Sequence, residues 1–290
     1  MNMPAAGQLA IVATPIGNLE DITLRAVRLL REATLIACED TRHTRKLLEH
    51  LGISTRMVSY HEHNEAGRAE EIVSAIQRGE RVALVSDAGT PLLSDPGFRL
   101  VRLAVEAGLS IEVVPGPSAL LTAIAGSGIG CSSFYFGGFL PAKRTQRDRT
   151  LQELQSLDTA LVFYEAPHRI VETLQSIAEH MPGREVCAAR ELTKLHEEWL
   201  RGDAKEVAST LEARDSIRGE FTVVLGRPQP VDPASAQLPL EEAIAQLVTL
   251  GMERMDALKQ VARERGLSKR DVYDALERAK RQKSGAPSKP

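Results

Sequence analysis

The chain contains 290 residues and carries 36 Lys and Arg against 39 Asp and Glu, so its net charge is −3, and 43% of its residues are hydrophobic. This length is sufficient for two medium domains. The charge balance excludes a polycation that binds nucleic acid through its bulk charge, so any such contact must come from local basic patches. The three cysteines, Cys38, Cys131 and Cys187, show no paired spacing, which argues against a disulfide framework or a zinc ribbon.

No charged leader with an apolar core is present at the N-terminus, and the longest uncharged stretch, 113–142, is interrupted by several prolines and glycines. These features predict a cytoplasmic protein without a signal peptide or a membrane helix. We interpret 113–142 as a buried crossing between two lobes and as part of a subunit interface.

The first 119 residues alternate short apolar runs with amphipathic segments. The runs predict strands at 9–13, 35–38, 57–60, 81–85 and 111–114. The amphipathic segments predict helices around Leu24–Leu30 and at 41–51, 65–78 and 97–107. This alternation is typical of an α/β fold with a mostly parallel sheet and helices on both faces.

A loop of twelve residues, 86–97, follows the strand predicted at 81–85. It contains Asp87 and Asp95, two glycines and two prolines, and no Lys or Arg. Such a composition cannot continue a strand or helix, and ligands bind at the carboxyl ends of strands in open α/β sheets. The segments 14–18, 39–40 and 115–118 follow three further strands, so we expect all four loops at one edge, as a candidate active site.

The second half predicts another α/β lobe. Strands are expected at 134–136, 160–164, 186–190 and 221–225, and helices at 149–156, 170–179 and about 205–213. The segment 226–239 contains four prolines and is predicted to be a linker. Beyond it, 240–283 is predicted to be helical, with a helix-turn-helix outline at 257–275 around Gly266, and 284–290 to be a frayed tail. The predicted domains are therefore 1–119, 120–228 and 229–290.

Common cofactor and metal signatures are missing. The chain has neither a phosphate-binding loop nor a dinucleotide fingerprint, which makes ATP and NAD chemistry poor hypotheses. Four histidines (His43, His50, His61 and His63) lie near acidic residues. Their spacing does not match metal-ligand pairs, so solvated histidines or one acid-base group are the simpler interpretations.

Basic residues gather in three places. One group lies on the helix predicted at 41–51 and a second follows Pro141, and 251–290 contains eleven Lys and Arg against six Asp and Glu. Charge runs are commonly solvated faces. Because two of these groups lie near the predicted loops, we also consider contacts with a phosphate backbone. The candidate RNA-binding residues are Arg42, Arg45, Lys143, Arg144, Arg147 and Arg149.

Seven ordered motifs resemble one known family. They are TPIGNL at 14–19, CEDTR at 38–42, the loop 86–97, PGPSA at 115–119, FYEAPHR at 163–169, RELTK at 190–194 and GEF at 219–221. Together they resemble the tetrapyrrole-methylase fold family, and within it the bacterial enzymes that 2'-O-methylate a cytidine ribose in 16S rRNA of the small ribosomal subunit.

The resemblance implies an S-adenosylmethionine-dependent homodimer with the cofactor in the cleft between two α/β lobes and a decoding-region cytidine as target. No metal is implied. The residues that it assigns to the cofactor are Thr14, Pro15, Gly17, Asp87, Ala88, Gly89, Thr90, Pro91, Ser94, Asp95, Pro115, Ser118, Ala119, Phe139, Tyr164, Ala166, Pro167, Gly219, Glu220 and Phe221.

Methyl transfer to a ribose hydroxyl needs alignment of the reactants and an acceptor for the hydroxyl proton. The pair Glu39 and Asp40 is our first candidate, because it ends a central strand at the shared edge. Helix capping by Asp40 is an equal alternative. The other candidates are His61, His63, Glu165 and His168. Two other functions stay open, a tetrapyrrole methylase and a non-catalytic ribosome-assembly factor, since fold does not settle substrate.

Overall fold

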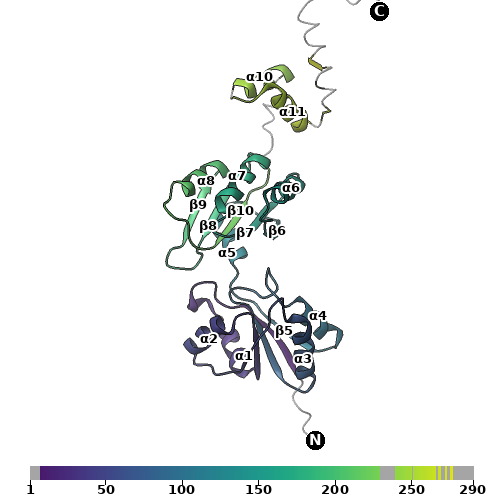
Figure 1. Ribbon diagram of the computed structural model, residues 1–290, viewed down its shortest axis with the longest axis vertical. Coiled ribbons are helices and arrows are strands. Elements are labelled where there is room, and N and C mark those ends of the chain that lie inside the picture. The colour runs from purple at the N-terminus through teal and green to yellow at the C-terminus, as the bar shows by residue number, and fades with distance from the viewer. Residues whose placement is uncertain are drawn as a thin grey trace, which may run out of the picture. The chain divides into compact units, whose positions relative to one another are not determined.

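The computed structural model describes residues 7–228, 239–249, 251–265, 267–268, 272 and 275–276. The chain divides into two compact units, Met1–Pro228 and Gln229–Pro290. The first unit contains two five-stranded sheets, and Figure 1 shows each sheet with its own helices.

The first sheet is entirely parallel, in the strand order β3-β2-β4-β1-β5. Its strands are β1 (Gln8–Val12), β2 (Leu35–Cys38), β3 (Met57–Ser59), β4 (Arg81–Val85) and β5 (Ser110–Val114). Its helices are α1 (Leu24–Glu32), α2 (Thr41–His50), α3 (Glu65–Gln77) and α4 (Phe98–Glu106), preceded by the short 3-10 helix η1 (Leu19–Asp21). The predicted parallel α/β sheet is therefore confirmed.

Helices cover both faces of this sheet because the side chains of each strand alternate between two apolar cores. In β4, Ala83 and Val85 join a core with Leu30 of α1. Val82 and Leu84 join a second core with α3 and α4. Burial on both faces explains why the interior strands β1, β2 and β4 are nearly continuous apolar runs without polar alternation.

The second sheet is mixed, in the order β6-β7-β10-β8-β9, with β6 parallel to β7 and the other neighbours antiparallel. Its strands are β6 (Phe134–Phe139), β7 (Ala160–Glu165), β8 (Val186–Arg190), β9 (Glu198–Gly202) and β10 (Phe221–Leu225). Its helices are α5 (Ala119–Ser127), α6 (Arg144–Leu154), α7 (Ile170–His180) and α8 (Ala204–Glu212). The second α/β lobe is confirmed, and β9 is an additional strand.

The segment 113–142 crosses from the first sheet to the second, as predicted, and contains α5 and β6. The prediction that it is buried was wrong, because Val113, Phe134 and Tyr135 are 57%, 43% and 41% exposed. Ser118 caps α5 through a hydrogen bond from the Leu121 N–H (3.4 Å), and Gly128 ends the helix in a left-handed conformation. Gly126 lies inside the helix because the Trp199 ring packs against it and leaves no space for a Cβ. This glycine serves side-chain packing rather than chain reversal.

In the second unit, α10 (Leu240–Thr249) and α11 (Arg254–Glu264) share an apolar core that includes Ile244, Leu258 and Val261. The predicted helical segment is confirmed for these residues. Several predicted parts lie outside the described residues. They are Gly266 and most of 269–275 in the helix-turn-helix outline, the linker residues 229–238 and the tail 284–290. Among the described helices, none combines the length and apolar character needed to cross a membrane.

Candidate active site

Four loops follow neighbouring parallel strands and bond to one another, as the sequence predicted. Thr14 after β1 and Gly89 after β4 exchange two main-chain hydrogen bonds, of 2.9 and 3.0 Å. The Asp40 N–H after β2 donates to Oδ1 of Asp87 (3.1 Å), and Thr90 Oγ1 donates to the Pro117 carbonyl after β5 (3.3 Å). The carboxyl edge of the first sheet is thus one connected group of loops.

A cavity of about 470 Å³ opens at this edge and is lined from both sheets of the first unit. The residues of the first sheet and its loops are Ile16, Asp87, Ala88, Gly89, Thr90, Leu93, Ser94, Asp95, Ser118 and Ala119. Those from the second sheet and its loops are Phe139, Tyr164, Glu165, Ala166, Pro167, Ala189, Glu191, Leu192, Lys194, Glu220, Phe221 and Thr222.

Most residues that the resemblance assigned to the cofactor lie on this lining. The exceptions are Thr14, Pro15, Gly17, Pro91, Pro115 and Gly219. Two of them, Gly17 and Gly219, pack directly against lining residues. A Cβ on Gly17 would lie 2.3 Å from Cγ of Lys194, and a Cβ on Gly219 would lie 2.4 Å from Cγ of Glu191. The close approach of these loops therefore requires glycine.

One wall of the cavity, the loop between β8 and β9, was not predicted from the sequence. Lys194 on this loop donates from Nζ to Glu191 Oε1 (2.8 Å) and to Glu220 Oε2 (3.0 Å). Burial alone would lower the pKa of Lys194, but the hydrogen bonds to these two carboxylates and their charges outweigh burial, so the pKa lies above its usual value. The RELTK motif was the available signal, since it was part of the resemblance without being assigned to the site. The other missed lining residues are Ile16, Leu93, Ala189, Leu192 and Thr222, whereas Glu165, a predicted candidate proton acceptor, does lie on the lining.

Backbone strain concentrates in two loops of the cavity. Among the described residues, positive φ outside glycine occurs at Leu92 (74°), Ser94 (69°), Glu191 (50°) and Thr193 (65°). Each such residue costs on the order of 1–3 kcal/mol and persists where the surroundings hold it in place. Strain in the two loops that face each other across one cavity is characteristic of a functional site.

The acidic groups of the first sheet influence one another. Burial raises the pKa of Asp95 to about 7, with further contributions from the charges of Glu39 and Asp87. Burial also raises the pKa of Glu39, assisted by Asp87 and Glu62. Asp95 therefore carries a carboxyl that titrates near neutral pH at the cavity wall.

Neither predicted catalytic residue, Glu39 or Asp40, lies on the cavity lining. Asp40 caps α2, since its Oδ1 accepts the Arg42 N–H (2.8 Å), and its Oδ2 pairs with the Arg42 guanidinium (2.7 Å). Hydrogen bonds from the Arg42 side chain hold the pKa of Asp40 well below its usual range. A carboxylate stabilised in this way is a poor proton acceptor.

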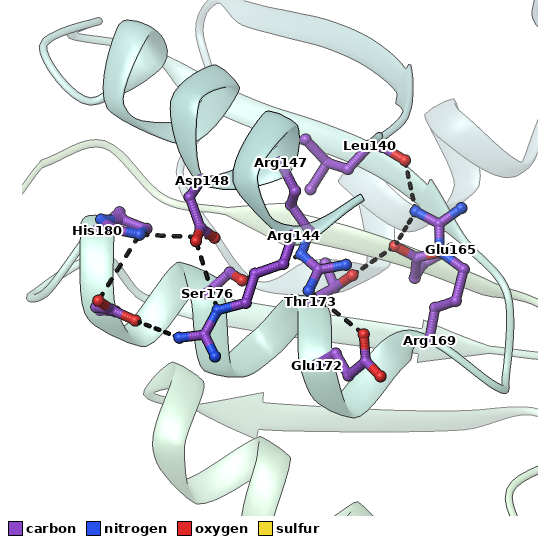
Figure 2. A network of polar contacts seen from close by, with 11 residues as sticks. Leu140, Arg144, Arg147, Asp148, Glu165, Arg169, Glu172, Thr173, Ser176 and His180 are labelled. Atoms are coloured by element: carbon purple, nitrogen blue, oxygen red, sulfur yellow. Dashed lines mark hydrogen bonds and ion pairs between the residues drawn. The ribbon is translucent and has the colours of Figure 1, made fainter. Parts of the chain in front are cut away.

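The predicted basic groups differ in exposure. Arg42, Arg45, Lys143, Arg144 and Arg149 are exposed. The prediction for Arg147 was wrong, because this side chain is 1% exposed and lies between α6 and α7 (Figure 2). Its Nε donates to Ser176 Oγ (3.0 Å) and its Nη2 to Glu172 (3.4 Å). Arg147 joins two helices and is not available to a phosphate.

The histidines do not form a metal site with their neighbours. In the part of the chain that the structure describes, no group of three or more His, Cys, Asp and Glu is placed to hold a metal ion. His61 and His63 pack edge to face, with ring centroids 5.9 Å apart.

Comparison with known proteins matches residues 8–208 to the family described as tetrapyrrole (corrin/porphyrin) methylases. The chain is 44% identical over 273 residues to a ribosomal RNA small subunit methyltransferase I of Halalkalibacterium halodurans, covering 92% of this chain and 94% of the relative. It is 48% identical over 219 residues to the protein of that name from Thermotoga maritima, covering 76% and 98%.

Solved structures share the fold at low sequence identity. The methyltransferase CobJ matches with a TM-score of 0.58 and 20% identity, over 76% of this chain and 94% of that one. A uroporphyrin-III C-methyltransferase of Thermus thermophilus complexed with S-adenosyl homocysteine matches with a TM-score of 0.53 and 20% identity, over 76% and 97%. On this evidence, the chain belongs to the tetrapyrrole methylase family and, within it, to the ribosomal RNA small subunit methyltransferases I.

Proposed function

We propose that this protein transfers a methyl group from S-adenosylmethionine to the ribose 2'-hydroxyl of a cytidine in the decoding region of 16S rRNA. The observation that carries the proposal is one cavity lined both by the acidic loops of the first sheet and by the aromatic residues Phe139 and Tyr164 of the second. Relatives that are 41–48% identical and named for ribosomal RNA methylation support this substrate over a tetrapyrrole, since the uroporphyrin and cobalt precorrin methyltransferases share only 15–20% identity.

The residues present fit this cofactor. A volume of about 470 Å³ is within the range of small-molecule sites. Asp87 and Asp95 place negative charge where a cationic donor requires it, and Phe139 and Tyr164, whose ring centroids are 5.7 Å apart, form an apolar wall suited to a planar base. When bound, S-adenosylmethionine supplies an electrophilic methyl group on a positively charged sulfur.

We assign to Asp95 the role of accepting the proton of the ribose hydroxyl, and to Glu39 a supporting role through its charge. A general base is most effective when its pKa lies near the working pH, and that of Asp95 is about 7. Burial is the main reason that this pKa is high, and the charge of Glu39 raises it further. Asp40 instead pairs with Arg42 and caps α2.

For RNA binding we propose the exposed cations of α2 and α6, which are Arg42, Arg45, Lys143, Arg144 and Arg149. Arg144 and Arg149 pair with acidic residues of α6 and α7. Exposed pairs of this kind contribute little free energy, so phosphates can replace the carboxylates without a large penalty.

We also propose a homodimer in the cytoplasm. Phe98 and Val105 on α4 are 71% and 62% exposed, and Val113 on the edge strand β5 is 57% exposed. An edge strand flanked by exposed apolar side chains favours association with a second copy. Light scattering of the purified protein tests this part, and a monomer at micromolar concentration contradicts it.

Transfer of a labelled methyl group tests the main proposal. Purified protein is incubated with methyl-labelled S-adenosylmethionine and small subunits from cells that lack this modification, with naked rRNA and a porphyrinogen in parallel. Label on one cytidine ribose of 16S rRNA is expected. Label on a base or on the porphyrinogen, or no transfer, contradicts the proposal.

A further inference from the structure

Arg169 precedes α7 and bridges two segments of the cavity wall from behind. Its Nη2 donates to the Leu140 carbonyl (2.5 Å) and to Glu165 Oε2 (3.3 Å), and its Nε lies 3.3 Å from Glu165 Oε1. Figure 2 shows Arg169 directed at both partners. Arg169 is not itself among the residues that line the cavity.

The Glu165 carboxylate is buried and fully engaged. Its side chain is 0% exposed. Oε1 accepts the Ala166 N–H (2.8 Å), and Oε2 accepts the Thr173 hydroxyl (2.6 Å) in addition to Arg169. A buried carboxylate requires a counter-ion and hydrogen bonds to remain charged without penalty, and Arg169 supplies the counter-ion.

The two bridged segments have different support. Glu165 ends β7 in the interior of the sheet, where it is paired in register with Phe221 of β10. Leu140 follows β6, and the β6–β7 ladder is irregular between Phe136 and Phe139. Gly138 in this stretch has a φ of +60°. The ladder is therefore interrupted at Gly137 and Gly138 and resumes with one pair, Phe139 with Tyr164 of β7. The Arg169 bond to the Leu140 carbonyl fixes the chain directly after this last pair.

Both bridged segments contribute directly to the cavity. Phe139 precedes Leu140, while Ala166 and Pro167 follow Glu165, and all three line the wall. One guanidinium group thus links the chain beside Phe139 to the chain beside Ala166, in addition to the ladder pair of Phe139 with Tyr164. A forked, planar group that contacts a carboxylate and a carbonyl together cannot be replaced by an ammonium.

We propose that Arg169 is a positioning residue that sets the spacing between Phe139 and the Ala166–Pro167 turn, and thereby the affinity for the adenosine part of the cofactor. The inference rests on the proposed function for the identity of the ligand. It adds a residue that acts through Leu140 and Glu165 rather than by contact.

The test compares Arg169→Lys with a matched control, Arg184→Lys. Arg184 is 3% exposed and donates to four main-chain carbonyls, those of Gln155, Leu157, Thr159 and Gly226, at the opposite ends of β7 and β10. Calorimetry measures the affinity for S-adenosylhomocysteine, steady-state assays give KM and kcat, and thermal melting reports folding.

We expect Arg169→Lys to weaken S-adenosylhomocysteine binding about tenfold and to raise KM for the donor similarly, with kcat within about threefold of the wild type. Arg184→Lys should lower the melting temperature and leave the affinity unchanged. Equal loss of affinity in both variants, unchanged affinity in Arg169→Lys, or a loss confined to kcat would overturn the inference. Failure of the wild type to bind S-adenosylhomocysteine would instead refute the proposed function.

Discussion

Raising the pH from 6 to 8 should tighten binding of S-adenosylmethionine, because the Asp95 carboxyl has to lose its proton before it can attract a sulfonium. In the free cavity, burial together with Glu39 and Asp87 raises the pKa of this carboxyl to about 7. Ionised Asp95 is thus the minor form at pH 6 and the major form at pH 8.

The magnitude follows from the fraction of protein that is competent to bind. With a pKa of about 7, roughly a tenth of Asp95 is ionised at pH 6 and roughly nine tenths at pH 8. If the donor binds the ionised form, its apparent affinity rises about tenfold over this interval, which corresponds to about 1.4 kcal/mol. The demethylated product carries a neutral thioether, so its affinity should change less.

Calorimetric titrations with S-adenosylmethionine and S-adenosylhomocysteine at pH 6, 7 and 8 measure this difference. Asp95→Asn should abolish the pH dependence of the affinity ratio, whereas Asp215→Asn, at an exposed position, should retain it. The reasoning is refuted if both ligands show the same pH dependence, or if Asp95→Asn keeps that of the wild type.

Three further predictions concern RNA binding and stability. The first variant replaces Lys143 at the N-cap of α6 and Arg144 and Arg149 within it by alanine. It should reduce the slope of log affinity for rRNA against log salt concentration by about 2 and leave the affinity for S-adenosylhomocysteine unchanged. Arg147→Ala should lower the free energy of unfolding by about 2–4 kcal/mol, because it removes a buried hydrogen bond to Ser176 and an ion pair with Glu172. Urea titrations measure this change, and a variant as stable as the wild type contradicts the structural role of Arg147. Gly126→Ala should cost about 1–3 kcal/mol, since the added Cβ would lie 2.2 Å from the Trp199 ring, and a melting temperature equal to that of the wild type refutes this packing.

The first sheet could be predicted because its signals are local. Fully apolar strands alternate with amphipathic helices, and parallel strands place their carboxyl ends together. Four unusual loops in the sequence therefore predict one edge of the sheet as the site. The contacts between Thr14 and Gly89 and between Asp40 and Asp87 are the direct result.

Four of the five strands of the second sheet could be predicted, but β9 and the order of the strands could not. Its central strand β10 is the last in the chain and lies between β7 and β8, a pairing that no local pattern encodes. The cavity wall at Glu191–Lys194 depends on this order and was missed for that reason. The burial of Arg147 had a weaker signal, since Leu151 follows four positions later on the same helix face and is 0% exposed.

Strand register explains why the second sheet offers a continuous wall. Phe221 at the start of β10 is aligned with Glu165 at the end of β7 and with Arg190 at the end of β8, so antiparallel pairing brings three segments to one edge. The end of β6 joins them through a parallel ladder with an irregularity before Phe139. Main-chain pairing therefore fixes three of these segments firmly and the fourth loosely. Cofactor affinity should accordingly be most sensitive at Phe139, because beyond the irregularity its segment is held by a single ladder pair, with Tyr164, and by the Arg169 side chain.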